Sequence, residues 1–275
     1  MKKLLVIIFI IAIMLITYYS YISYNHSLIV FNKLSMVESE DIDMDVYELK
    51  VMTYNIRQGI GMDDKLDLNR IAEVIKESNA DIISLTEVDH RLPRTKLQNQ
   101  IRFLADKLEM NYAFAPNLKT STGSYGNAIL SKYPLENVKN HKLPIREDIE
   151  PRGVLEAVVS LPINQDIHVF STHFTPSYIE RPKQLEWTNS YLKSIKNPYI
   201  FMGDLNMEFP ILNNQESLMA DLKTYPSIEP THGIDHIFSN APFELVERYV
   251  IDTQASDHLP AVVKFIVEPK SDKKV

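Results

Sequence analysis

Polar side chains stand where several apolar segments of this sequence end, and their types are those that acid, base and metal chemistry uses. A single polar residue at a strand end is usually a loop cap. Neighbouring strand ends in a sheet, however, bring residues that are distant in sequence to one edge. Six such ends therefore predict one shared site. The residues are Asn55, Glu87, His173, Asp204 with Asn206, Asp235 with His236, and Asp257 with His258.

This set of carboxylates, amides and imidazoles suits hydrolysis of a phosphate ester with a hard divalent cation. Oxygen ligands favour Mg²⁺ or Mn²⁺, and such a cation polarises a phosphoryl oxygen. An aspartate can orient and deprotonate water, an asparagine can hold the phosphate, and a histidine held by an aspartate can steady developing charge. Other hydrolase classes lack their motifs, because the chain has no cysteine, no HExxH and no G-x-S-x-G.

The elements that must position these residues alternate between short strands and amphipathic helices. The pattern predicts helices over 67–78, 98–110 and 180–195, with Asp67 as the cap of the first helix. The segments HIF, FELVERYVI and HLPAVVKFIV are expected to form strands near the end, the last of them beginning at Asp257 and His258. This order favours an α/β fold with mixed sheets and helices outside. The other predicted strands are 51–56, 80–88, 126–132, 152–161, 167–174 and 198–206.

The charge balance bears on which partners are expected. The formal net charge is −7, and no run of Lys or Arg supplies the basic stripe that proteins use to hold nucleic acid phosphates. We therefore do not expect tight nonspecific binding to duplex nucleic acid. The absence of cysteine excludes disulfides and thiolate zinc sites.

The first residues predict attachment to a membrane. Residues 4–22 follow two lysines and carry no charge; as a helix, such a segment spans ~28 Å, close to the ~30 Å of a bilayer core. We expect residues 1–31 to be a membrane anchor or uncleaved signal, followed by an acidic linker over 32–49, a catalytic domain over 50–267 and a polar tail over 268–275. The domain is then expected outside the cytoplasm, and secreted if the first segment is cleaved.

The motifs TYNI, LTEV, GNAILS, PRG, STHF, GDLN, GIDHIF and SDHLP, in this order, resemble those of the endonuclease/exonuclease/phosphatase superfamily. The resemblance covers about residues 50–267 and is most specific in the combination of GDLN, IDHIF and SDHLP. It implies a four-layer α/β sandwich with two packed mixed β-sheets flanked by helices. It also implies a bound Mg²⁺ or Mn²⁺.

The resemblance implies a role for each matching residue. Glu87 would be the principal metal ligand, Asp204 would activate water, and His258, oriented by Asp235, would contact the scissile phosphate. The implied catalytic residues are His258, Asp204, Asn206, His173 and Asp235; the implied metal residues are Glu87, Asn55 and Asp257; and the implied substrate contacts are Arg152 and Asn127.

Three neighbours depart from the superfamily pattern: Thr86 replaces Gln, Leu205 replaces Phe and His236 replaces Tyr. None of these removes a key residue, although no carboxylate partner is evident for His173. We expect metal-dependent hydrolysis of a phosphodiester or phosphomonoester, such as a lipid head group or inositol phosphate, by a monomer. The alternatives are a surface-attached or secreted nuclease acting on DNA or RNA, and a non-catalytic binding module with the same fold.

Overall fold

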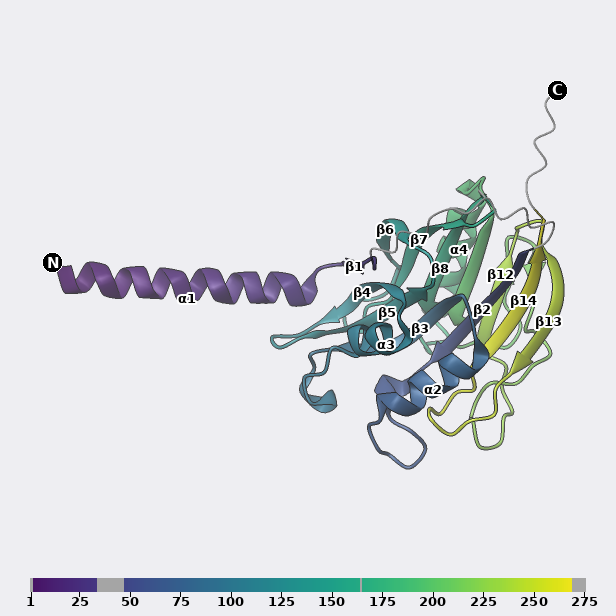
Figure 1. The fold of residues 1–275 in the computed structure, drawn as a ribbon, viewed down its shortest axis with the longest axis horizontal. Helices are drawn as coiled ribbons and strands as arrows, with labels where there is room; N and C mark the ends of the chain where they lie inside the picture. Colours follow the sequence, from purple (N-terminus) through teal and green to yellow (C-terminus); the bar gives the residue numbers. More distant parts are fainter. Residues whose placement is uncertain (1, 34–46, 164, 269–275) are drawn as a thin grey trace, which may run out of the picture.

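Two mixed β-sheets form the centre of the protein (Figure 1). The computed structural model describes residues 2–33, 47–163 and 165–268. Within them, the larger sheet has the order β1 (Ile29–Phe31), β4 (Asn111–Lys119), β5 (Ser124–Ser131), β3 (Ile82–His90), β2 (Tyr47–Asn55), β14 (Ala261–Val267) and β13 (Glu244–Val250). The smaller sheet has the order β12 (Asp235–Ser239), β9 (Tyr199–Asp204), β8 (Gln165–His173), β7 (Gly153–Leu161) and β6 (Leu135–Lys142). The pairs β2–β3 and β8–β9 are parallel, and the other described pairs are antiparallel.

Helices cover the outer face of each sheet. Apolar residues of α2 (Leu68–Ser78) and α3 (Gln100–Leu108) pack on the larger sheet, and α4 (Arg181–Ser194) packs on the smaller one. The Asp67 side chain accepts a hydrogen bond from the Asn69 backbone N–H at 2.9 Å, which confirms the predicted cap of α2. The predicted four-layer α/β sandwich is confirmed.

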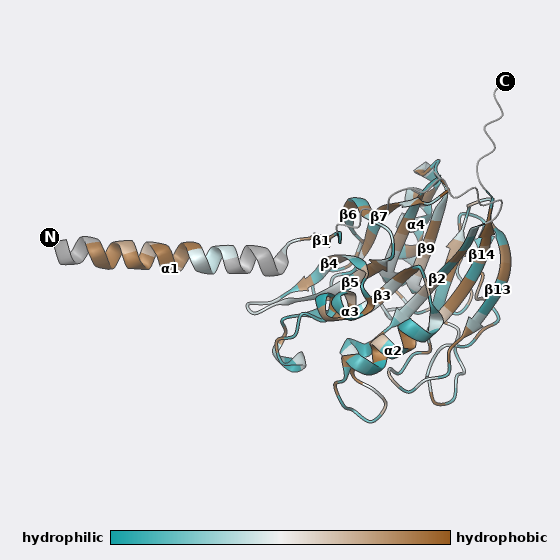
Figure 2. Cartoon of the chain, in the orientation of Figure 1, coloured by the Kyte–Doolittle hydropathy of each residue, from teal (hydrophilic) through white to brown (hydrophobic). Residues whose placement is uncertain are grey.

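The alternation of side chains along each strand builds the layers. Val51 of β2 and Val169 of β8 point into the core between the two sheets, whereas their neighbours Met52 and Phe170 pack toward the helices. Successive strand residues face opposite sides of a sheet, so strands buried on both faces read as continuous apolar runs. Figure 2 shows this apolar character along the inner strands.

Three strands differ from the predicted elements. The strands β4 and β6 had no predicted counterpart. The strand β14 begins at Ala261, so Asp257 and His258 lie in the loop before it and do not start the strand. The remaining short elements are η1 (Arg57–Gly59), η2 (Pro93–Thr95), β10 (Ile211–Leu212) and β11 (Gln215–Glu216).

The amino-terminal segment forms α1 (Lys2–His26), which extends away from the sheets in Figure 1. Among the described residues, no helix combines the length and the apolar character needed to cross a membrane. The predicted membrane anchor therefore receives no support from the structure. Of the predicted linker, 34–46 lie outside the described residues, as do 269–275 of the predicted tail. The strands β1 and β2 begin inside the segments predicted as anchor and linker, because Ile29 pairs with Phe114 and Leu49 is buried in the core.

Candidate active site

The ends of strands from both sheets meet around Asp204. Asn55 is the last residue of β2, His173 the last of β8 and Asp204 the last of β9, while Asp235 opens the antiparallel neighbour β12. The register pairs Asp204 with His173 on one side and with Asp235 on the other. The Asn55 Nδ2 donates to Asp204 Oδ2 at 3.0 Å and so joins the two sheets at this edge. The predicted convergence of strand ends is present.

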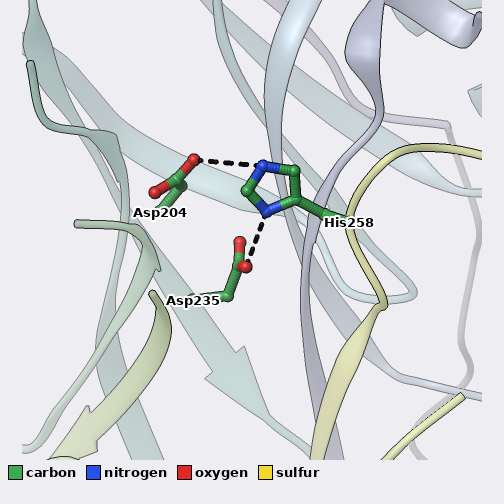
Figure 3. Close-up of side chains that lie close together, drawn as sticks. All are labelled: Asp204, Asp235 and His258. Atoms are coloured by element: carbon green, nitrogen blue, oxygen red, sulfur yellow. Dashed lines mark hydrogen bonds and ion pairs between the residues drawn. The ribbon is translucent and has the colours of Figure 1, made fainter. Parts of the chain in front are cut away.

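His258 reaches this edge from the loop that connects β13 and β14. Its Nδ1 lies 2.8 Å from Asp235 Oδ2, and its Nε2 lies 3.8 Å from Asp204 Oδ2 (Figure 3). The loop is held in place because the Ser256 hydroxyl donates to the backbone carbonyl of Asn55 at 2.7 Å. The imidazole is thus fixed between two carboxylates, one on each ring nitrogen.

Burial and neighbouring charges shift the pKa values of His258 and Asp204 in directions that suit acid and base chemistry. Burial alone would lower the pKa of His258, but the Asp235 carboxylate, together with the charges of Asp204 and Asp257, outweighs it and raises the pKa to about 10. Burial, together with the Asp235 charge, raises the pKa of Asp204 to about 7. A protonated imidazole therefore faces a carboxylate that can take up a proton near neutral pH.

The second histidine also contacts Asp204. His173 Nε2 lies 3.5 Å from Asp204 Oδ2, which supplies the carboxylate neighbour that sequence reasoning left open. The Asn206 Nδ2 lies 3.2 Å from His173 Nε2 and donates to the Phe174 carbonyl at 2.9 Å. Burial lowers the pKa of His173 well below its usual value, so the ring is neutral. Asn206 in this structure positions His173, and a bond from its Nδ2 to a phosphate requires exchange of one of these bonds.

Glu87 is the residue that best fits a metal ion. A bulge between Leu85 and Val88 interrupts β3, and Glu87 adopts a left-handed φ of 59° there; bulges of this kind redirect a side chain. Its carboxylate accepts hydrogen bonds from the side-chain amides of Asn55 and Gln58. No ion pair to Glu87 exists among the described residues, and burial raises its pKa. A cation bound there would balance the negative charge of the Glu87 carboxylate. Carboxylate and amide oxygens are ligands typical of Mg²⁺ and Mn²⁺.

A different group meets the geometric condition for three clustered ligands. Within the described part of the chain, only Asp204, Asp235 and His258 place their ligand atoms within 4.8 Å of one another. Asp235 Oδ2 already binds His258 and accepts a bond from the Thr224 hydroxyl at 2.6 Å, so this cluster acts as a hydrogen-bonded relay. The predicted metal residue Asp257 is not brought into a cluster with Glu87; its Oδ2 lies 3.8 Å from Arg57 Nε.

The two predicted substrate contacts differ in position. Arg152 is nearly buried, and its charge acts on both Glu87 and His173, which places it beside the site. Asn127 is buried, and its Nδ2 donates to the Gly153 carbonyl of the other sheet at 2.9 Å. The Asn127 side chain therefore joins the two sheets, and its contact with substrate stays a prediction.

Sequence reasoning missed several residues that touch the site. Gln58 binds Glu87, Thr224 binds Asp235, and the Tyr225 ring packs against His258 at 4.8 Å between centroids. Gln58 lies three residues beyond the end of β2, a position that the strand-end argument could have included. Thr224 and Tyr225 lie in a loop without periodic pattern, and no local signal marked them.

The residues of this site lie within a region that matches a known protein family. The Endonuclease/Exonuclease/phosphatase family matches residues 52–258, which include every residue of this site. The chain belongs to this family. Its members are hydrolases that act on phosphoesters and typically depend on a divalent metal.

Similar proteins support the family and the fold. The chain is 27% identical over 242 residues to protein YbhP of Escherichia coli (strain K12), covering 78% of this chain and 94% of YbhP. A structure from Beutenbergia cavernae of the same family has a TM-score of 0.62 and 24% identity, covering 80% of this chain and 72% of that one. A mannosyl-6-phosphatase of Bacteroides thetaiotaomicron has a TM-score of 0.60 and 17% identity, covering 79% and 99%. At these identities the structures establish the shared fold.

Proposed function

We propose that this protein hydrolyses a phosphate ester with a divalent cation, using Asp204 as the base that activates water. The observation that carries the proposal is the position of Asp204. This carboxylate is 2% exposed and lies within 4 Å of a neutral imidazole, of an imidazole held protonated by a second carboxylate, and of an amide from the opposite sheet. Buried ionisable groups with strongly shifted pKa values cluster at catalytic sites, which supports a role of Asp204 in proton transfer.

The residues divide the reaction between them. Asp204 accepts a proton from the attacking water as the water oxygen bonds to phosphorus. The His258 imidazolium, held by Asp235, faces the negative charge that develops on the phosphoryl oxygens. His173 stays neutral and, with Asn206, keeps the Asp204 carboxylate oriented. A divalent cation held by Glu87 would supply further charge neutralisation at the phosphoryl oxygen.

We propose Mg²⁺ or Mn²⁺ as the cation, held by Glu87. The amide oxygen of Asn55 joins it only if the amide group turns over, because its Nδ2 faces Glu87 and its Oδ1 accepts from the Arg57 backbone N–H at 3.1 Å. The support is chemical: Glu87 is a partly buried carboxylate without an ion pair among the described residues, and the available donors are oxygens. Asp257 reaches such an ion only if its side chain leaves Arg57.

The proposed substrates are small phosphodiesters or phosphomonoesters such as lipid head groups and inositol phosphates. The net charge of −7 argues against long nucleic acids as the preferred substrate, because duplex binding depends on many cationic contacts. The similar mannosyl-6-phosphatase is an example of a phosphatase with this fold. We further propose, from the sequence pattern of the first residues, that a monomeric domain acts outside the cytoplasm. Protease treatment of intact cells tests this placement, and full protection of the domain contradicts it.

The test of function is a substrate panel with added Mg²⁺, Mn²⁺ or Ca²⁺. The panel contains bis(p-nitrophenyl) phosphate, sphingomyelin, phosphatidylinositol, inositol phosphates, plasmid DNA and RNA. We expect hydrolysis of the aryl diester and of at least one small ester. Cleavage of DNA or RNA alone assigns the protein as a nuclease, and no cleavage of any substrate favours a binding module.

A further inference from the structure

A pocket of about 490 Å³ lies directly beside the candidate active site. Its walls include Arg181, Asn206, Phe209, Tyr225 and His232. Two of these residues also belong to the site, because Asn206 binds His173 and the Tyr225 ring packs on His258. An ester whose phosphorus lies next to Asp204 and His258 can therefore extend one of its substituents into this pocket.

Arg181 brings an uncompensated positive charge to the pocket wall. Its Nη1 donates to the backbone carbonyl of Asn206, while a guanidinium has five N–H donors. No described carboxylate forms an ion pair with Arg181, in contrast to Arg94 with Asp89 and Arg248 with Asp221. Burial lowers the pKa of Arg181, and the charge of Asp204 opposes that shift, so the guanidinium is partly desolvated and near the reacting groups.

The other charges around the pocket already have partners. Glu208, the acidic residue of the wall, lies 2.9 Å from His232 Nδ1 and 3.1 Å from Lys223 Nζ. The Lys223 ammonium also stands 5.8 Å from the centroid of the Phe209 ring. Phe209 is 73% exposed and offers an apolar face that no described side chain covers fully. The pocket thus combines one available guanidinium with the rings of Phe209 and Tyr225.

We propose that this pocket recognises the alcohol part of the ester and that Arg181 binds a second anionic group carried by it, a phosphate or a carboxylate. A guanidinium presents a planar fork that matches both groups with paired hydrogen bonds. The carbon skeleton between the two anions lies against Phe209 and Tyr225. Arg181 is then a specificity-determining residue, and the inference rests on the proposed function because it places the scissile phosphate beside Asp204.

The test measures binding without turnover. Glucose 6-phosphate and glucose 1,6-bisphosphate are titrated calorimetrically into the full chain carrying Asp204→Asn, so that neither probe is consumed. We expect the bisphosphate to bind about tenfold more tightly than the monophosphate, since charge-assisted hydrogen bonds are the stronger ones. Adding Arg181→Gln should reduce this ratio to below about twofold, and Arg181→Lys should retain part of it because lysine keeps the charge but loses the fork.

Arg102→Gln is the matched control, because Arg102 is exposed on α3 and pairs with Asp106. The control should leave the ratio unchanged. An unchanged affinity ratio in folded Arg181→Gln overturns the inference. An equal loss of affinity for both probes also overturns it, because Arg181 would then contact the scissile phosphate. If circular dichroism shows Arg181→Gln unfolded, an undiminished ratio in Arg181→Lys overturns it. Failure of the proposed function itself appears separately, as absence of hydrolysis by the unmodified chain.

Discussion

At the residue scale, the site depends on ionisable groups whose charges are set by one another. Asp235 binds the His258 Nδ1 and accepts from Thr224, and this fixes both the orientation and the charge of the imidazole. Burial alone would lower the pKa of His258, and the Asp235 carboxylate is the main group that opposes this and favours the charged ring, with smaller contributions from Asp204 and Asp257. Below pH 6.5 the pair contributes its full stability, and this contribution is lost as the pH rises through about 10.

Asp235→Asn should lower the pKa of His258 by about 1–3 units, because it removes the nearby opposite charge while keeping the side-chain volume. NMR titration of the His258 imidazole in the full chain measures this shift. The alkaline limb of the activity profile should move to lower pH with it, since the charged imidazole is lost at a lower pH. Asp221→Asn, which removes an exposed carboxylate paired with Arg248, should move neither. An unchanged His258 titration in Asp235→Asn would show that Asp235 does not control this ring.

At the element scale, the approach of β8 to β9 determines where Asp204 lies. Gly203 has a φ of +149°, and a Cβ added there would lie 1.9 Å from the Thr172 carbonyl oxygen of β8. Backbone atoms cannot yield as a flexible side chain can, so the residue before Asp204 must be glycine.

Gly203→Ala should destabilise the fold by about 3 kcal/mol, since it overpacks a buried strand pair. It should also displace Asp204 from His173. Denaturant unfolding and activity measure the two effects. Gly61→Ala is the control, because an added Cβ there meets only the flexible Arg70 guanidinium. A Gly203→Ala protein as stable as its parent would contradict the steric argument.

A second network fixes α4 on the smaller sheet, away from the site. Burial opposes ionisation of Glu156, but hydrogen bonds from His141, Tyr191 and His168 prevail and lower its pKa to about 2. The stability from this group is therefore present above pH 4.5 and is lost as the pH falls through about 2.

Glu156→Gln should remove up to about 3 kcal/mol of the acid-dependent part of the unfolding free energy, at 1.36 kcal/mol per unit of pKa shift. Denaturant unfolding between pH 2 and 7 measures the slope. The exposed Glu77→Gln substitution should leave it unchanged. Equal slopes in Glu156→Gln and the parent would exclude this network as a source of acid sensitivity.

Strands and helices with a clear apolar pattern were predictable from the sequence. Strands without such a pattern were not. The strand β6 has mainly polar, solvent-facing residues and contributes only Leu135 fully to the core, so no period marks it. Pro116 interrupts β4, which hides that strand from pattern reasoning. Residues at strand ends, such as Glu87 and Asp204, were located because motifs mark them. Arg181 was not located from the sequence, because its proposed role in binding depends on a pocket that forms only when the loops after β8 and β9 meet.

At the scale of the whole molecule, two sheets contribute halves of one site. The larger sheet supplies Asn55 and Glu87, and the smaller sheet supplies His173, Asp204 and Asp235. Proper packing of the sheets against each other is therefore a condition for activity, and the bond between Asn55 and Asp204 crosses that interface. The proposed metal position lies on one sheet and the proposed base on the other.

The most direct measurement is hydrolysis of bis(p-nitrophenyl) phosphate by the full chain after chelation, before and after addition of Mg²⁺ or Mn²⁺, in parallel with Asp204→Asn. We expect no hydrolysis without the cation and recovery on its addition. The Asp204→Asn protein should be slower by about 10²–10⁴-fold, the usual contribution of a general base, while keeping the same circular dichroism spectrum. Hydrolysis that persists without a cation, or that is unchanged in Asp204→Asn, would contradict the account.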